Sequence, residues 1–219
     1  MVESPREKIR KRMEHVRNPP KSLVNYDDIW RIGVSSDVCQ ELLSCLDSSD
    51  PLDVADGLFF LIGLLRHHSW NSFDADFQSR FITILPSLLM HPRGSVRSLA
   101  IPLFVHFKDN FCDYRQQMMR LLADSDLTNR SLALKHYGTF SIASEITPLL
   151  RFKGDDYVGE LSMNGQFVYE LRDIALEQIE SKTGMRFRIN IRSEDFDGTK
   201  VYWYDWVDFL RWFADRRGA

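Results

Sequence analysis

The chain has 219 residues, of which 44% are hydrophobic and 27% are charged, and its formal net charge is -3. This length suits a single domain with a sizeable core, and the composition is that of a globular protein, not a disordered or fibrous one. The acidic balance excludes a general electrostatic attraction to nucleic acid or to anionic membranes. The composition therefore argues against a nucleic-acid partner.

No segment predicts membrane insertion or secretion. The longest strongly apolar stretch, residues 58–65, is far shorter than the roughly 18–20 residues that cross a bilayer. The first residues are charged, and no apolar region follows them as it would in a secretory signal. The three cysteines have no Cys-x-x-Cys spacing, which favours buried thiols over disulfides or a zinc site. We therefore expect a cytoplasmic protein with no membrane partner.

Residues 1–21 form a basic segment, in which seven basic residues outnumber three acidic ones, whereas the remainder has 21 basic and 28 acidic residues. Ile9, Met13 and Val16 recur at helical spacing, and Pro19-Pro20 ends the pattern. We expect a basic helix that docks on the rest of the protein. A free binding arm is the alternative.

One short pattern recurs along residues 36–184. Residues 97–100 (Arg-Ser-Leu-Ala), 130–133 (Arg-Ser-Leu-Ala) and 172–175 (Arg-Asp-Ile-Ala) align without gaps, and residues 56–59 are a degenerate copy. The successive offsets are 41, 33 and 42 residues, a range typical of repeats built from helical hairpins.

Each copy of the pattern follows an apolar segment and a short turn. The apolar segments read as helices that end near Leu46, Leu89, Leu122 and Leu150. The turns after the first three contain Asp, Ser, Pro or Gly, which are helix stop and N-cap signals. The pattern predicts about four helical hairpins, each packed within itself and against its neighbour.

The C-terminal third departs from this pattern. Asn164-Gly165 lies between two apolar dipeptides, which is a strong signal for a β-hairpin. Residues 186–192 alternate with period two and predict a strand, which pairs with residues 201–204. Residues 204–216 predict a final helix that caps the structure. The fold class predicted is therefore all-α with a small β-hairpin insertion.

The repeats resemble those of bacterial HEAT-like repeat proteins. The closest part is the Glu-Leu-Arg-Asp-Ile-Ala-Leu run at 170–176, then Thr183-Gly184, then a Trp-rich end with Trp203, Trp206 and Trp212. The resemblance implies a right-handed α/α superhelix whose concave face binds another macromolecule. It covers residues 36–184 and indicates fold much better than function, because such solenoids have many roles.

The resemblance also gives the motif arginines a structural meaning. In this family the arginine of the second helix commonly pairs with neighbouring repeats. The resemblance therefore implies a ladder of polar contacts between successive repeats, formed by Arg97, Arg130, Arg172 and Asp173. A role in a binding face is the alternative.

No catalytic or metal-binding constellation is visible in the sequence. His67 and His68 are adjacent and diverge on a helix, and no His-Glu-x-x-His, Gly-x-Ser-x-Gly or phosphate-binding glycine loop occurs. The turn at 193–198 resembles part of a calcium loop, but Tyr204 stands where such a loop needs a glutamate. We expect no cofactor and no enzymatic activity.

The leading interpretation is a non-catalytic scaffold or adaptor that binds another protein, for example an immunity-type protein that neutralises a toxin or enzyme. Exposed aromatic side chains beside arginines form plausible hot spots, and packing of a terminal cap is the alternative role for the same aromatic residues. The predicted partner-binding residues are Arg186, Arg188, Arg192, Trp203, Tyr204 and Trp206. The sequence determines neither the partner nor the oligomeric state.

The second interpretation is a nucleic-acid-binding protein related to HEAT-like DNA glycosylases. Such enzymes hold a damaged nucleotide against a basic surface with Trp, Arg and Asp residues. The acidic charge of the repeats opposes this interpretation, because binding to DNA requires many Lys and Arg contacts to phosphates.

Overall fold

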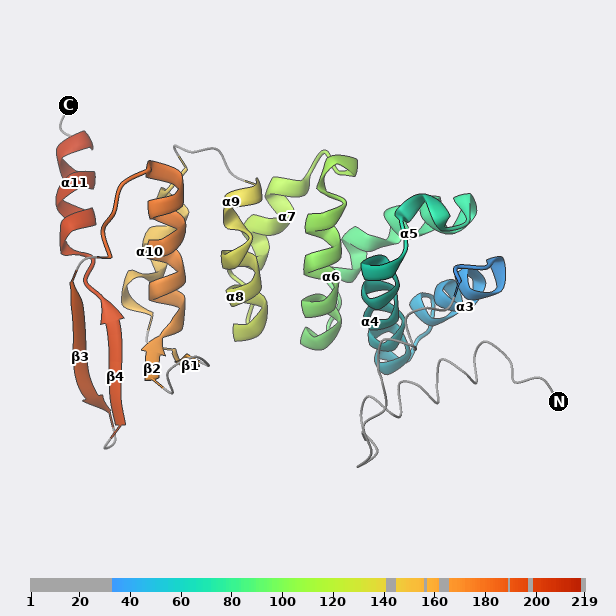
Figure 1. Ribbon diagram of the computed structural model, residues 1–219, viewed down its shortest axis with the longest axis horizontal. Helices are drawn as coiled ribbons and strands as arrows, with labels where there is room; N and C mark the ends of the chain where they lie inside the picture. Colours follow the sequence, from blue (N-terminus) through green and yellow to red (C-terminus); the bar gives the residue numbers. More distant parts are fainter. Residues whose placement is uncertain are drawn as a thin grey trace. The chain divides into compact units, whose positions relative to one another are not determined.

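The computed structural model describes residues 33–217, except residues 141–144, 156, 162–165, 189 and 197–198. The basic segment predicted at residues 1–21 lies outside the described residues. The described chain is mostly helical (Figure 1). It divides into two compact units, Met1–Phe111 and Cys112–Ala219. Among the described residues, no helix is both long enough and apolar enough to cross a membrane.

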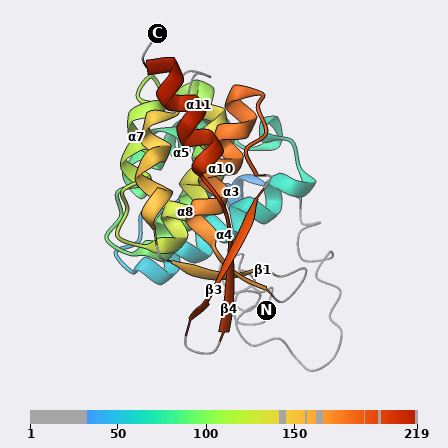
Figure 2. The same cartoon turned by 90° about the vertical axis from the view of Figure 1, so that its left-hand side faces the viewer.

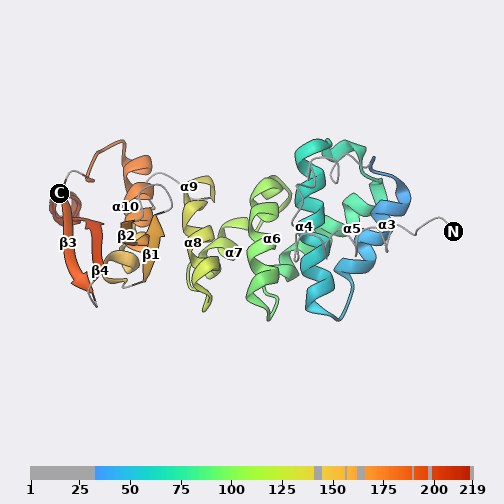
Figure 3. The ribbon, with the colours of Figure 1, turned by 60° about the horizontal axis from the view of Figure 1, so that its bottom comes forward.

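The first unit contains two helical hairpins, as predicted (Figure 3). Their helices are α3 (Ser36–Leu46), α4 (Pro51–His67), α5 (Ala75–Leu88) and α6 (Gly94–His106), with short 3₁₀ helices η1 (Trp70–Ser72) and η2 (Lys108–Asn110). Helices α3 and α4 contact each other, as do α5 and α6. Contacts also join α3 to α5 and α4 to α6. The two hairpins therefore stack with first helix against first helix and second helix against second helix.

Local signals account for the hairpin turns. The side chain of Asp50 accepts a hydrogen bond from the N–H of Leu52 (2.9 Å), and Pro51 occupies the first position of α4. Gly57 allows α3 and α4 to approach closely, because a Cβ at this position would lie 2.9 Å from the Cβ of Cys45. The degenerate motif copy at 56–59 thus has a glycine where the packing leaves no room for a side chain.

The second unit combines helices with a sheet. Its helices are α7 (Tyr114–Leu121), α8 (Leu127–Lys135), α9 (Tyr137–Phe140), η3 (Thr147–Gly154), α10 (Glu170–Thr183) and α11 (Val207–Arg217). Helices α7 and α8 form the third predicted hairpin, and α10 packs against both α8 and η3. In place of the helix predicted to end near Leu150, the structure has the short 3₁₀ helix η3, which continues to Gly154. Its buried Leu149 and Phe152 are three residues apart and therefore share one side.

The recurring motif marks equivalent positions in three helices. Ala100 in α6, Ala133 in α8 and Ala175 in α10 are all fully buried. Each motif therefore lies in the second helix of its hairpin, as the alignment predicts. A small buried side chain lets neighbouring helices approach closely, and α8 and α10 contact each other.

Four strands form one mixed sheet in the second unit (Figure 2). They are β1 (Val158–Leu161), β2 (Gln166–Tyr169), β3 (Ile191–Phe196) and β4 (Thr199–Tyr204), in the order β1-β2-β4-β3. The antiparallel pair β1–β2 confirms the predicted hairpin, although Asn164-Gly165 lies outside the described residues. The parallel pairing of β2 with β4 joins both hairpins, so the expectation of an all-α protein is incomplete.

Two predicted boundaries are wrong for identifiable reasons. The strand predicted at 186–192 begins only at Ile191, because the N–H groups of Phe187 and Arg188 both donate to Glu180 Oε1 (2.6 Å each) and not to a neighbouring strand. The final helix begins at Val207 and not at Tyr204, which is the last residue of β4.

Candidate functional site

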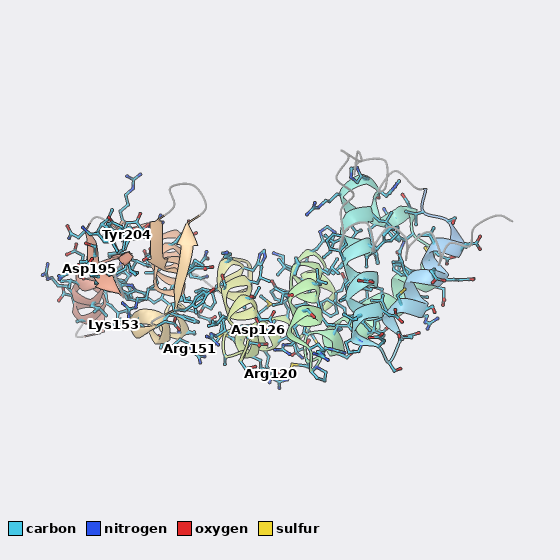
Figure 4. The ribbon with its side chains drawn as sticks, turned by 90° about the horizontal axis from the view of Figure 1, so that it is seen from below. Arg120, Asp126, Arg151, Lys153, Asp195 and Tyr204 are labelled. Carbon is cyan, nitrogen blue, oxygen red and sulfur yellow. The ribbon has the colours of Figure 1, made fainter. Side chains whose placement is uncertain are left out.

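The β3–β4 hairpin presents one face to solvent. Residues that oppose each other in a sheet, and alternate residues along a strand, point to the same side. We call this side the outer face, and it consists of the pairs Ile191–Tyr204, Ser193–Tyr202 and Asp195–Lys200. Ile191 is 64% exposed, whereas Val201 on the opposite side is fully buried. Figure 4 shows Tyr204 and Asp195 on this hairpin.

Arg188 links the outer face to α10. Its Nε donates to Glu180 Oε2 (2.6 Å), and its guanidinium lies 5.5 Å from the ring centroid of Tyr204. Burial raises the pKa of Glu180, but the hydrogen bonds from Arg188 and Phe187 outweigh burial, so the pKa of this carboxyl lies below its usual value. The predicted binding residue Arg188 is therefore neutralised and held in place by its own chain.

Asp173 connects the start of α10 to the end of β4. Its Oδ1 accepts the backbone N–H of Tyr204 (3.1 Å). Burial raises the pKa of Asp173 to about 6, and the hydrogen bond from Tyr204 and the charges of Arg188 and Arg172 only partly offset it. This carboxyl therefore titrates close to neutral pH.

Arg192 ties β3 to the start of α11. Its Nε donates to Asp205 Oδ2 (2.6 Å), and the other oxygen of Asp205 accepts the N–H of Val207 (3.1 Å) at the first turn of α11. Arg192 lies on the side of β3 opposite the outer face, because it alternates with Ile191 and Ser193.

The predicted aromatic residues divide between the core and the surface. Trp206 is only 4% exposed and packs 5.8 Å from the centroid of Phe209, so it belongs to the core of the C-terminal cap. Trp203 is half-buried and alternates with Tyr202 and Tyr204, which places it on the opposite side of β4. The interpretation as cap packing therefore suits Trp206, and Tyr204 is the predicted aromatic residue on the outer face.

Arg186 is exposed, and it lies in the segment between α10 and β3. It therefore lies outside β3, although the sequence predicts a strand over residues 186–192.

The motif arginines brace their own hairpin turns. Arg97 Nη1 donates to the carbonyls of His91 (2.6 Å) and Pro92 (3.0 Å). Arg130 Nη1 donates to the equivalent carbonyls, those of residues 124 (2.7 Å) and 125 (3.3 Å). These bonds of each arginine thus lie within its own hairpin and do not reach a neighbouring one. Arg172 is half-buried beside Asp173 in α10, and a ladder between repeats stays a prediction.

Several further residues contribute to this region. Tyr202 and Ile191 could have been assigned to the outer face from the period-two alternation around Tyr204. Glu180 and Asp205 carry no sequence signal as partners of Arg188 and Arg192, because the fold alone brings them together.

Within the described part of the chain, no group of three or more His, Cys, Asp or Glu residues is placed to hold a metal ion. No protein-family model matches the sequence, and no curated protein matches it significantly.

Proposed function

We propose that this chain is a non-catalytic protein-binding module, and that the outer face is its partner-binding surface. The main support is Ile191, which is 64% exposed on the same face as two tyrosines. Large exposed apolar side chains mark contact sites when they cluster, and tyrosines are enriched in energetic hot spots. An immunity-type neutralising role and a general adaptor role are both forms of this function.

The surroundings of the outer face suit a binding surface. Arg188 and Asp173 hold Tyr204 from its ring and its backbone, so little conformational freedom is lost when a partner binds. Asp195 and Lys200 supply a charged rim at the other end of the hairpin. In this proposal the helical hairpins support the sheet. We further propose that the hairpins stack as the α/α superhelix that the resemblance implies.

The proposal is tested by partner capture with matched variants. The double variant Ile191→Ser/Tyr202→Ser removes apolar side chains from the outer face. The control variant, Met185→Ser, removes an apolar side chain that is 45% exposed and does not belong to the outer face. A protein recovered from the source cell by wild type is purified, and its affinity is measured by calorimetry. We expect at least a tenfold loss for the double variant, or about 1.4 kcal/mol, and no change for Met185→Ser. Equal affinities for all three proteins would place the binding surface elsewhere.

The nucleic-acid alternative has one supporting observation. Arg120 on α7 and Arg151 and Lys153 on η3 are all exposed in the second unit (Figure 4). Binding to plain and to damaged duplex DNA at low salt tests this alternative, because contacts to phosphates are strongest there. If no affinity is measured under those conditions, the alternative has no support.

A further inference from the structure

We propose that the chain forms a symmetric dimer in which β3 pairs antiparallel with β3 of a second copy. The two four-stranded sheets then become one continuous sheet. This dimer does not depend on partner binding at the outer face, because edge pairing uses the backbone in the plane of the sheet.

The first argument is the direction of the backbone groups of β3. Strand β3 is an edge strand, since β4 is its only neighbour in the described sheet. The N–H of Asp205 donates to the carbonyl of Asn190 (2.9 Å), which sets the phase of the β3–β4 ladder. Because hydrogen-bonded pairs alternate in antiparallel ladders, Ile191, Ser193 and Asp195 direct their N–H and C=O groups away from β4. These three residues are exposed. The edge therefore offers a row of backbone donors and acceptors to another strand.

The second argument is charge complementarity between two copies of β3. When two antiparallel copies are centred on Ser193, Arg192 of each copy opposes position 194 of the other, which is a glutamate. Opposite charges at opposed positions stabilise a strand pair, and like charges destabilise it. This register therefore contains two favourable pairs.

The neighbouring registers are unfavourable. A pair centred on Arg192 places arginine against arginine, and a pair centred on Glu194 places glutamate against glutamate. Charges on edge strands usually prevent indiscriminate pairing. Here the opposite charges at positions 192 and 194 oppose these two neighbouring registers and favour the one centred on Ser193.

The arrangement of the monomer is compatible with this pairing. Arg192 already binds Asp205 of its own chain through Nε, and a guanidinium has five N–H donors, so others remain for a second carboxylate. Because β3 has six residues, the interface is short, and we expect a weak dimer that depends on protein concentration.

Sedimentation equilibrium of the purified full chain measures the dimer without any partner. For wild type we expect the average mass to rise with concentration from 25.7 kDa toward twice that value. Glu194→Arg and Arg192→Glu each create like-charge pairs and should weaken self-association at least tenfold. An equimolar mixture of the two variants has opposite charges at every such pair and should associate again, as a heterodimer.

Substitution of Ser193 separates backbone pairing from side-chain effects. Ser193→Pro removes an outward N–H at the dimer axis without removing a bond to β4, whereas Ser193→Thr keeps this N–H. Circular dichroism confirms that each variant is folded. We expect Ser193→Pro to abolish the dimer and Ser193→Thr to retain it. A wild-type monomer at every concentration, or a dimer equally strong in Glu194→Arg and Ser193→Pro, overturns the proposal. Neither result affects the test of the outer face, which is read from partner affinity.

Discussion

Asp173 shows how a single residue couples two elements of the second unit. It belongs to α10, but its carboxylate accepts the N–H of Tyr204 at the end of β4. Strand β4 ends there, beyond its paired positions with β2, so the carboxylate replaces a strand as the hydrogen-bonding partner. Burial of this group makes its negative charge costly.

The raised pKa of Asp173 predicts a specific dependence of stability on pH. Because the folded-state pKa is about 6 and the ordinary value is 3.8, the folded chain binds more protons than the unfolded chain between these pH values. This group therefore stabilises the fold at low pH and loses that contribution as the pH rises through 6. The full difference is on the order of 3 kcal/mol, from about 1.4 kcal/mol per pKa unit.

The substitution Asp173→Asn tests this prediction, since an amide oxygen can still accept the N–H of Tyr204 but carries no charge. We expect the stability of the variant relative to wild type to increase from pH 4 to pH 7 by about 1–3 kcal/mol, as measured by urea unfolding. Asp215→Asn, at an exposed position of α11, is the matched control and should show little change. A relative stability of Asp173→Asn that is independent of pH would contradict the raised pKa.

At the scale of elements, the turn between α7 and α8 is held from two directions. Asp126 accepts the N–H groups of Thr128 (2.9 Å) and Asn129 (3.3 Å), which satisfies free donors at the start of α8. Arg130 reaches back from the first turn of α8 to the carbonyls of residues 124 and 125. The hairpin is thus fixed by one acid and one base close together in the chain.

We predict that Arg130→Ala destabilises the protein by about 1–2 kcal/mol, because two carbonyls of the turn lose a charged donor. Arg120→Ala removes an exposed arginine from the adjacent helix α7 and is the control, with a much smaller expected effect. Chemical denaturation of both variants measures the difference. If the two variants are equally stable, the brace contributes nothing to the hairpin.

At the scale of the whole molecule, each unit has a core of its own. The first contains stacked aromatic rings, among them Phe77 and Phe81 with centroids 5.9 Å apart. The second buries Tyr137 and Phe209 completely, the former among helices and the latter in the C-terminal cap. A unit with its own core can fold alone when the chain between units carries few contacts.

We therefore predict that residues 33–111 and residues 112–219, expressed separately, are each folded. Each fragment should have helical circular dichroism, and each should unfold in one cooperative thermal transition. The full chain provides the reference. Gradual unfolding of either fragment, or strong binding of a dye that detects exposed apolar surface, would show that this unit needs the other.

Local chemistry determined most of the helical part. The first three hairpins follow from apolar spacing, from Asp50 and Asp126 as caps, and from a motif whose alanine is buried in α6, α8 and α10. The β1–β2 hairpin likewise follows from a short-range turn signal. These features depend on residues within one or two turns of each other, so the sequence alone specifies them.

The tertiary structure decided the candidate site. The sequence could not show that the N–H groups of residues 187 and 188 donate to Glu180 and not to a neighbouring strand. Nor could it show that Asp205 neutralises Arg192, or that Trp206 lies in the core. It also could not show that β2 pairs with β4, which leaves β3 at an edge. Each of these outcomes depends on contacts between residues that are distant in the chain. The periodicity of apolar residues in the sequence indicates only which side of its own helix or strand a residue occupies, so it could not predict those contacts.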